Sequence, residues 1–238
     1  MNESKKRILA AISSIMASLA LMFADILLGG RTLSADDYPL FSVEYVEKVD
    51  INLILELLAI PTERLQASYL IIVLCVPLLL PAMWLIYQSF ADSSKWYAIG
   101  TYFVLMAGAT LTPLLHANFF FIGEIYKAIL HTSQVAHPNL LEIGSLFIRS
   151  HYIGWAVALF ILMVGWLGYA LCIFLGKTIL PRWSGLMSPF LLLIVINLIF
   201  SIGPESLRIT LSKASLTISY FIFFIFLISN KQRKDLLK

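Results

Sequence analysis

The feature that most constrains this chain is a series of long apolar stretches separated by short polar segments. A helix needs roughly 20 apolar residues to cross the hydrocarbon core of a bilayer, and the stretches approach or exceed that length. We expect one transmembrane helix in each: about 8–30, 67–90, 96–123, 151–176, 187–203 and 209–229. The fifth is the shortest. The predicted fold class is therefore all-α, a single integral membrane domain over residues 1–238 built as a six-helix bundle.

The composition agrees with a polytopic membrane protein and argues against nucleic-acid binding. Charged residues make up 13% of the chain, about half of the roughly 25% typical of a soluble domain. Lysines and arginines gather at the ends of the apolar stretches rather than in a patch with interleaved aromatic residues. Because such a patch is the electrostatic footprint of nucleic-acid binding, we exclude that partner.

The positions of lysine and arginine predict the orientation of the helices. Cytoplasmic loops of membrane proteins are enriched in these two residues. Basic residues at the two chain ends and in two of the connections all fall on one side if both termini are cytoplasmic: Lys5, Lys6, Arg7, Lys95, Lys177, Arg182, Lys231, Arg233, Lys234 and Lys238. We therefore expect the N and C termini on the cytoplasmic side.

The connection between the first two predicted helices contains an amphipathic segment. In DINLILELLAIPTER (50–64), polar or small residues recur at helical spacing among leucines and isoleucines: Asn52, Glu56, Ala59 and Glu63. The segment is too short to span a membrane, so we expect it to lie along the outer interface or to cap the bundle. Pro61 should break it before the second span. A further short outer helix is expected around 140–148.

A histidine and a glutamate interrupt the third stretch in PLLHANFFFIGEIYK (113–127). If Trp96 lies at the cytoplasmic headgroups, His116 is about 30 Å further along a helix that rises about 1.5 Å per residue. His116 is therefore predicted near the outer boundary of the bilayer, not at its midplane. Pro113 should kink the helix one turn earlier. Glu124 follows on roughly the same face and is predicted outside the hydrocarbon.

Other ionisable residues fall in the same outer layer. Asp25 is near the outer end of the first predicted helix, Arg64 precedes the second, and His151 opens the fourth. A charge one or two turns below the membrane surface is costly unless it is paired or hydrated. We therefore expect Asp25 to pair with Lys213 or Arg208, near the start of the last helix.

Three functions are compatible with this layer. The first is binding or sensing of a lipid headgroup or small amphiphile in an outward-facing polar cavity, with Asp25, Arg64, His116 and His151 as the ligand-binding residues. The second is an intramembrane enzyme that modifies a lipid, with His116, Glu124 and His151 as catalytic candidates, because an imidazole titrates near neutral pH and a carboxylate can orient it. The third is a structural accessory or immunity-type protein in which these residues only pack.

Motifs for other chemistries are absent. The sequence contains no HExxH, HxxxH, GxSxG or CxxC, so we predict no metal ion, no bound cofactor and no serine nucleophile. Cys75 and Cys172 lie inside apolar stretches and are predicted to be core residues. The expected partners are membrane lipids, with a homo-oligomer or another membrane protein as an open alternative.

Small residues predict close helix packing. The fourth stretch carries a series of them: Gly154, Ala158, Gly165 and Gly168. Such residues let helix backbones approach closely in a membrane, where no hydrophobic drive exists between helices.

Several segments resemble DUF6796, a family of uncharacterised bacterial multi-pass membrane proteins. The similar segments are ADILLGG (24–30), PTERLQASYL (61–70), LLHANF (114–119) and TILPRWSGLMSPFLLL (178–193). The resemblance implies an all-helical protein of the bacterial cytoplasmic (plasma) membrane. It places five residues on motif positions: Asp25, Arg64, His116, Pro181 and Trp183. It implies no activity.

Overall fold

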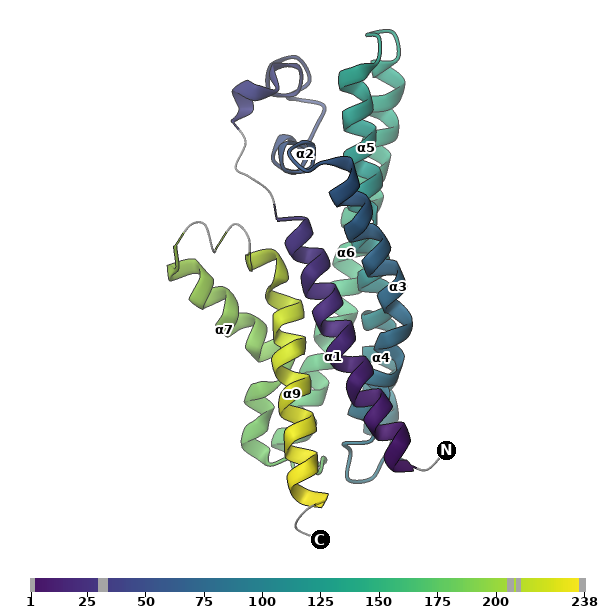
Figure 1. The fold of residues 1–238 in the computed structure, drawn as a ribbon, viewed down its shortest axis with the longest axis vertical. Coiled ribbons are helices and arrows are strands. Elements are labelled where there is room, and N and C mark those ends of the chain that lie inside the picture. Colours follow the sequence, from purple (N-terminus) through teal and green to yellow (C-terminus); the bar gives the residue numbers. More distant parts are fainter. Residues whose placement is uncertain (1–2, 30–33, 205–207, 209–210, 236–238) are drawn as a thin grey trace.

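The computed structural model describes residues 3–29, 34–204, 208 and 211–235. The long helices form an elongated bundle with their axes close to one direction (Figure 1). The main helices are α1 (Glu3–Leu27), α2 (Ile51–Leu58), α3 (Thr62–Tyr87), α4 (Trp96–His116), α5 (Asn118–His131), α6 (His137–Phe174), α7 (Pro189–Ile202) and α9 (Ser215–Asp235). Short helices lie between them: η1 (Ala35–Asp37), η2 (Leu40–Glu44), η3 (Arg182–Met187) and η4 (Ser212–Ala214).

Five helical stretches of the described chain are long and apolar enough to cross a membrane: Lys5–Leu27, Thr62–Tyr87, Trp96–His131, His137–Phe174 and Ser212–Asn230. The all-α, multi-pass membrane class is thereby confirmed. The predicted fifth span corresponds to α7, whose 14 residues reach only about 21 Å at about 1.5 Å per residue, against a hydrocarbon core of about 30 Å. The count of six spans stays a prediction. The predicted limits at residues 30 and 209 lie outside the described residues.

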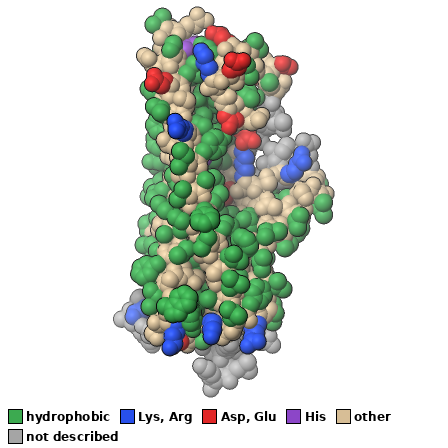
Figure 2. Space-filling view, turned by 180° about the vertical axis from the view of Figure 1, so that it is seen from behind, with side chains coloured by type: hydrophobic (Ala, Val, Ile, Leu, Met, Phe, Trp, Pro, Cys, Tyr) green, Lys and Arg blue, Asp and Glu red, His purple; other side chains and the backbone are tan. Residues whose placement is uncertain are grey.

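The start of α1 and the end of α9 lie at the same end of the bundle (Figure 1). We name this the terminal end and the opposite one the distal end. Figure 2 shows a broad apolar band between a row of lysine and arginine side chains at the terminal end and a mixture of acidic and basic side chains at the distal end.

The distal end consists of the α5–α6 hairpin and a cap segment, residues 34–58, that packs against it. Phe41 and Ile54 of the cap are fully buried in one cluster with Tyr126 of α5. The Asp50 carboxylate caps the N-terminus of α2 by accepting from the Leu53 N–H at 3.3 Å, and it also accepts from the Tyr152 hydroxyl. The amphipathic segment between the first two long helices is therefore confirmed as α2, and Pro61 directly precedes α3 as expected.

Two predicted boundaries are wrong. The separate helix around 140–148 does not exist, because α6 runs without interruption from His137 to Phe174. Its only proline, Pro138, is at the start, where the missing N–H costs nothing. Conversely, the third predicted helix is divided at Ala117 into α4 and α5. Pro113, at which a kink was predicted, lies inside α4 one turn before this division.

Helices α4 and α6 approach through glycines. An added Cβ on Gly108 would lie 2.6 Å from the Cα of Leu162, and one on Gly165 would lie 2.8 Å from Leu105 Cδ2. Gly154 receives the Leu115 side chain in the same way, at 2.8 Å. The predicted close packing at Gly154 and Gly165 is thus confirmed. This interface fixes the spacing between His116 at the end of α4 and the middle of α6.

Candidate functional site

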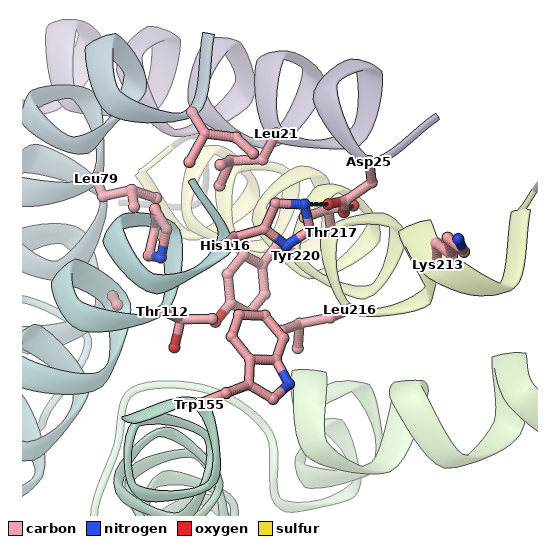
Figure 3. A pocket seen from close by; sticks show the side chains of 13 residues that line it. Leu21, Asp25, Leu79, Thr112, His116, Trp155, Lys213, Leu216, Thr217 and Tyr220 are labelled. Carbon is pink, nitrogen blue, oxygen red and sulfur yellow. Dashed lines mark hydrogen bonds and ion pairs between the residues drawn. The ribbon is translucent and has the colours of Figure 1, made fainter. Parts of the chain in front are cut away.

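Side chains of α1, α3, α4, α6 and α9 line a cavity of about 90 Å³ where α1 and α4 end. Asp25 comes from α1, His116 from α4, Trp155 from α6 and Thr217 from α9 (Figure 3). The remaining walls are mostly leucine, isoleucine, alanine and proline side chains. The cavity is therefore apolar with one polar side, which is the usual make-up of a small-molecule site.

Asp25 forms the centre of the polar side. Its side chain is 9% exposed, and its Oδ2 accepts a hydrogen bond from the Thr217 hydroxyl at 2.8 Å. Its Oδ1 lies 3.4 Å from Nε2 of His116. These contacts join α1 to α9 and α4, and they give a buried acid the neighbours that it requires within a membrane span.

His116 is buried, but its hydrogen-bonding capacity is not used. Its side chain is 14% exposed, and its Nε2 makes no hydrogen bond within the described residues. The 3.4 Å separation from Asp25 is within ion-pair range, although the ring is not aligned for a hydrogen bond, so the two groups are neighbours and not a closed pair. The ring packs between Phe119 and Trp155, with centroid distances of 5.0 and 5.6 Å. One polar ring atom thus remains to interact with a guest.

His151 belongs to the adjoining aromatic cluster and not to the cavity wall. It is 1% exposed, stacks on Trp155 with centroids 5.8 Å apart, and contacts Phe119 at 4.5 Å. Its Nδ1 has no hydrogen-bond partner in the part of the chain that the structure describes. His151 therefore supports Trp155, which in turn forms a wall of the cavity.

Glu124 lies in a different cluster from His116. Its Oε1 accepts hydrogen bonds from the Thr62 hydroxyl and from Lys127 Nζ, both at 2.9 Å. The Lys127 ammonium also contacts Thr62, at 3.2 Å. Glu124 therefore links the start of α3 to α5, and the structure does not bring it to the cavity.

Arg64 and Lys213 bind the carboxyl end of α1. The Arg64 guanidinium donates from Nη2 to the carbonyls of Ile26 and Gly29, at 2.9 and 2.7 Å. Lys213 donates to the Leu28 carbonyl at 3.3 Å and forms an ion pair with Glu56 of the cap at 2.7 Å. The last carbonyls of a helix lack partners within the helix and carry partial negative charge, which explains the two cations.

The predicted pairing of Asp25 with Lys213 or Arg208 is wrong. Within the described residues, the contacts of the Asp25 carboxylate are with Thr217 and His116. Figure 3 shows the Lys213 ammonium apart from this carboxylate, at the rim of the cavity. The sequence reasoning did not identify Thr217, although it follows Lys213 by one helical turn and so lies on the same face.

A family model described as a family of unknown function, DUF6796, matches residues 1–234. The chain belongs to the DUF6796 family. The resemblance found in four short segments is therefore confirmed, and it extends over nearly the whole chain. No curated protein and no solved structure matches the DUF6796 chain. Within the described residues of this DUF6796 protein, no group of three histidines, cysteines or acids is arranged to hold a metal ion.

Proposed function

We propose that this protein binds or senses a small amphiphile at one face of the membrane, in the cavity between Asp25, His116 and Thr217. The observation that carries the proposal is the unsatisfied, buried Nε2 of His116 beside a buried carboxylate in an otherwise apolar cavity. Buried polar atoms in proteins are nearly always hydrogen-bonded, so an exception at a cavity indicates a place for a guest.

The size and chemistry of the cavity limit the guest. About 90 Å³ is well below the roughly 300–1,000 Å³ of pockets that enclose drug-sized ligands. Only a small head or a short part of a molecule fits, while the rest stays in the bilayer. Because Asp25 is an acceptor and the walls are apolar, we propose a hydroxyl or amine head on an alkyl chain.

The orientation proposed for the protein places the cavity near the outer leaflet. The basic residues of the terminal end include Lys95, Lys177 and Arg182, and such residues are enriched on the cytoplasmic side. With the terminal end cytoplasmic, the Asp25–His116 level faces the exterior half of the bilayer.

The test uses three probes with one tail: octylamine, 1-octanol and octanoate, added to the purified protein in nanodiscs. The amine and the alcohol should raise the unfolding temperature. A ligand at ten times its Kd stabilises by about 1.4 kcal/mol, or about 3–6 °C at roughly 2–4 °C per kcal/mol for a chain of this size. Octanoate should not raise the unfolding temperature, because its carboxylate would lie beside the carboxylate of Asp25.

Variants assign the effect to the cavity. Asp25→Asn should abolish the preference for octylamine over octanoate, and His116→Gln should weaken the binding of both octylamine and 1-octanol. Lys177→Gln, at the terminal end, serves as the matched control and should behave as wild type. Equal stabilisation by all three probes, or responses unchanged in both cavity variants that remain monodisperse, would refute the proposal.

The proximity of an imidazole to a carboxylate favours a second candidate, an intramembrane enzyme that acts on a lipid with His116 as the acid/base. Its test is incubation of the purified protein with labelled membrane lipids between pH 5 and 9. Product that disappears in His116→Gln would support the enzyme, and absence of product throughout that range would exclude it. A His116→Gln protein that fails to fold would instead support the third candidate, a structural accessory or immunity-type protein.

A further inference from the structure

A second hollow lies on the distal surface, away from the Asp25–His116 cavity. It is an open groove of about 420 Å³ between the cap segment and the distal part of α6, with α5 at its base. The polar residues that line it are Lys48, Asp50, Tyr126, Ser145, Arg149 and Tyr152. The groove is thus formed by three segments that are far apart in the sequence.

The two cations of the groove are not neutralised by ion pairs. Lys48 and Arg149 are both exposed, and neither has an ion-pair partner within the described residues; Lys48 Nζ lies 5.8 Å from the centre of the Tyr45 ring. The one acid, Asp50, is already used by the Leu53 N–H and the Tyr152 hydroxyl. An anion in the groove would therefore meet two cationic heads that have no ion-pair partner in the described chain, and each oxygen of the acid beside them already accepts a hydrogen bond.

The base of the groove contains an unsatisfied donor. Tyr126 is fully buried, it lines the groove, and its hydroxyl has no hydrogen-bond partner among the described residues. Gly144 makes room for this hydroxyl, since an added Cβ there would lie 2.9 Å from the Tyr126 oxygen. A tyrosine that served only as a core residue would gain nothing from this hydroxyl, because an unpaired buried polar group is destabilising.

The depth of the groove corresponds to the headgroup layer. From Phe174 at the end of α6, Trp155 is about 30 Å away at about 1.5 Å per residue, which is the thickness of the hydrocarbon core. Arg149 follows about 9 Å further along the same helix. The headgroups occupy roughly 5–8 Å on each side of the core, so the long side chains of Arg149 and Lys48 can reach them.

We infer that this groove binds a phosphate group, and that its source is the headgroup of an anionic phospholipid. The Arg149 guanidinium has the planar geometry for two parallel hydrogen bonds to phosphate oxygens, and Lys48 adds a point charge. The Tyr126 hydroxyl donates from below. This site is independent of the amphiphile cavity, and its test does not depend on that proposal.

The experiment measures how much added phosphatidylglycerol the protein retains in phosphatidylcholine nanodiscs, by native mass spectrometry. Diacylglycerol with the same chains is the phosphate-free probe and should not be enriched. Arg149→Gln and Lys48→Gln should each weaken retention about tenfold, as expected for the loss of a charged hydrogen-bond partner. Lys177→Gln, a basic residue of the terminal end, should retain the lipid as wild type does.

Tyr126→Phe separates binding from folding. If the hydroxyl serves the phosphate, this variant weakens retention several-fold while its unfolding temperature stays equal or rises. Unchanged retention in both Arg149→Gln and Tyr126→Phe, or equal retention of diacylglycerol, would overturn the inference. Competition with inorganic phosphate and glycerol 3-phosphate decides the source. Displacement at low concentration assigns the site to a soluble phosphate, and failure to displace assigns it to the lipid.

Discussion

The tight contact of Gly108 with the Leu162 backbone gives a prediction whose magnitude follows from the structure. In Gly108→Ala, the new Cβ would lie 2.6 Å from Leu162 Cα and 2.8 Å from Leu162 N, whereas ordinary contacts begin at 3.4 Å. Both atoms are backbone, so no rotation of a side chain relieves the overlap. Helices α4 and α6 must therefore move apart by about 0.8 Å, and a gap of that size forfeits roughly a quarter to a half of each dispersion contact along the interface.

Gly100→Ala is the matched control, because Gly100 is in the same helix and nothing lies within 4 Å of its added Cβ. Both substitutions gain the same intrinsic helix preference of alanine, about 1 kcal/mol. Their difference is then the overpacking cost alone, about 1–3 kcal/mol. At roughly 2–4 °C per kcal/mol, Gly108→Ala should unfold about 2–12 °C below Gly100→Ala.

Thermal unfolding followed by tryptophan fluorescence, at several heating rates in one detergent, measures this difference. Adding Leu162→Ala should not restore the stability of Gly108→Ala, because the overlapping atoms belong to the Leu162 backbone. By contrast, Gly154→Ala meets only the end of the Leu115 side chain, which can rotate away, so its cost should be small. Equal unfolding temperatures for Gly100→Ala and Gly108→Ala would refute the packing argument.

Two further predictions concern the distal half of the protein. Arg64→Met removes both hydrogen bonds from Nη2 to the end of α1 and should lower the free energy of unfolding by about 2–3 kcal/mol. Its unfolding temperature should be lower than that of Glu63→Gln, which changes an exposed neighbour. Equal unfolding temperatures would show that solvent replaces the guanidinium. Tyr45→Phe removes the 2.8 Å hydrogen bond from the Tyr45 hydroxyl to His137 Nδ1 and leaves a buried acceptor. Tryptic cleavage at Lys48 in the cap should therefore accelerate about fivefold or more. Val43→Ala, which changes an exposed residue, should be cleaved at the wild-type rate, and equal rates for the two variants would contradict the role of His137.

The helices, and the common level of His116 and Trp155 along the bundle, could be predicted from hydropathy and helix geometry. Counting from Trp96 placed His116 at the outer boundary, and counting back from Phe174 at the end of α6 brings Trp155 to the same depth. The two rings are in contact, with centroids 5.6 Å apart. The level of a residue along the bundle is predictable because it depends on the rise per residue, which is nearly constant.

The partners of the charged residues could not be predicted in this way. Lys213 is at the correct depth for Asp25, but Glu56 of the cap and the Leu28 carbonyl lie nearer to it. Arg64, predicted to bind a ligand, donates a hydrogen bond to the end of α1. These choices depend on the rotation of each helix about its axis and on where the cap folds back. No local sequence pattern encodes either of them.

The more informative distinction is between polar groups that the fold satisfies and those that it does not. Arg64, Glu124 and Lys213 attract attention in the sequence because they are charged, yet the protein's own backbone and side chains occupy them. His116 and Tyr126 are less conspicuous, and each keeps a buried polar atom without a partner in the described chain. A satisfied charge has little interaction left to offer a ligand, whereas an unsatisfied buried atom destabilises the protein until something binds it. Both proposed sites therefore combine an orphaned buried atom with a charged neighbour, and His116→Gln and Tyr126→Phe are the variants that test whether the orphaned atom belongs to a site or to a core.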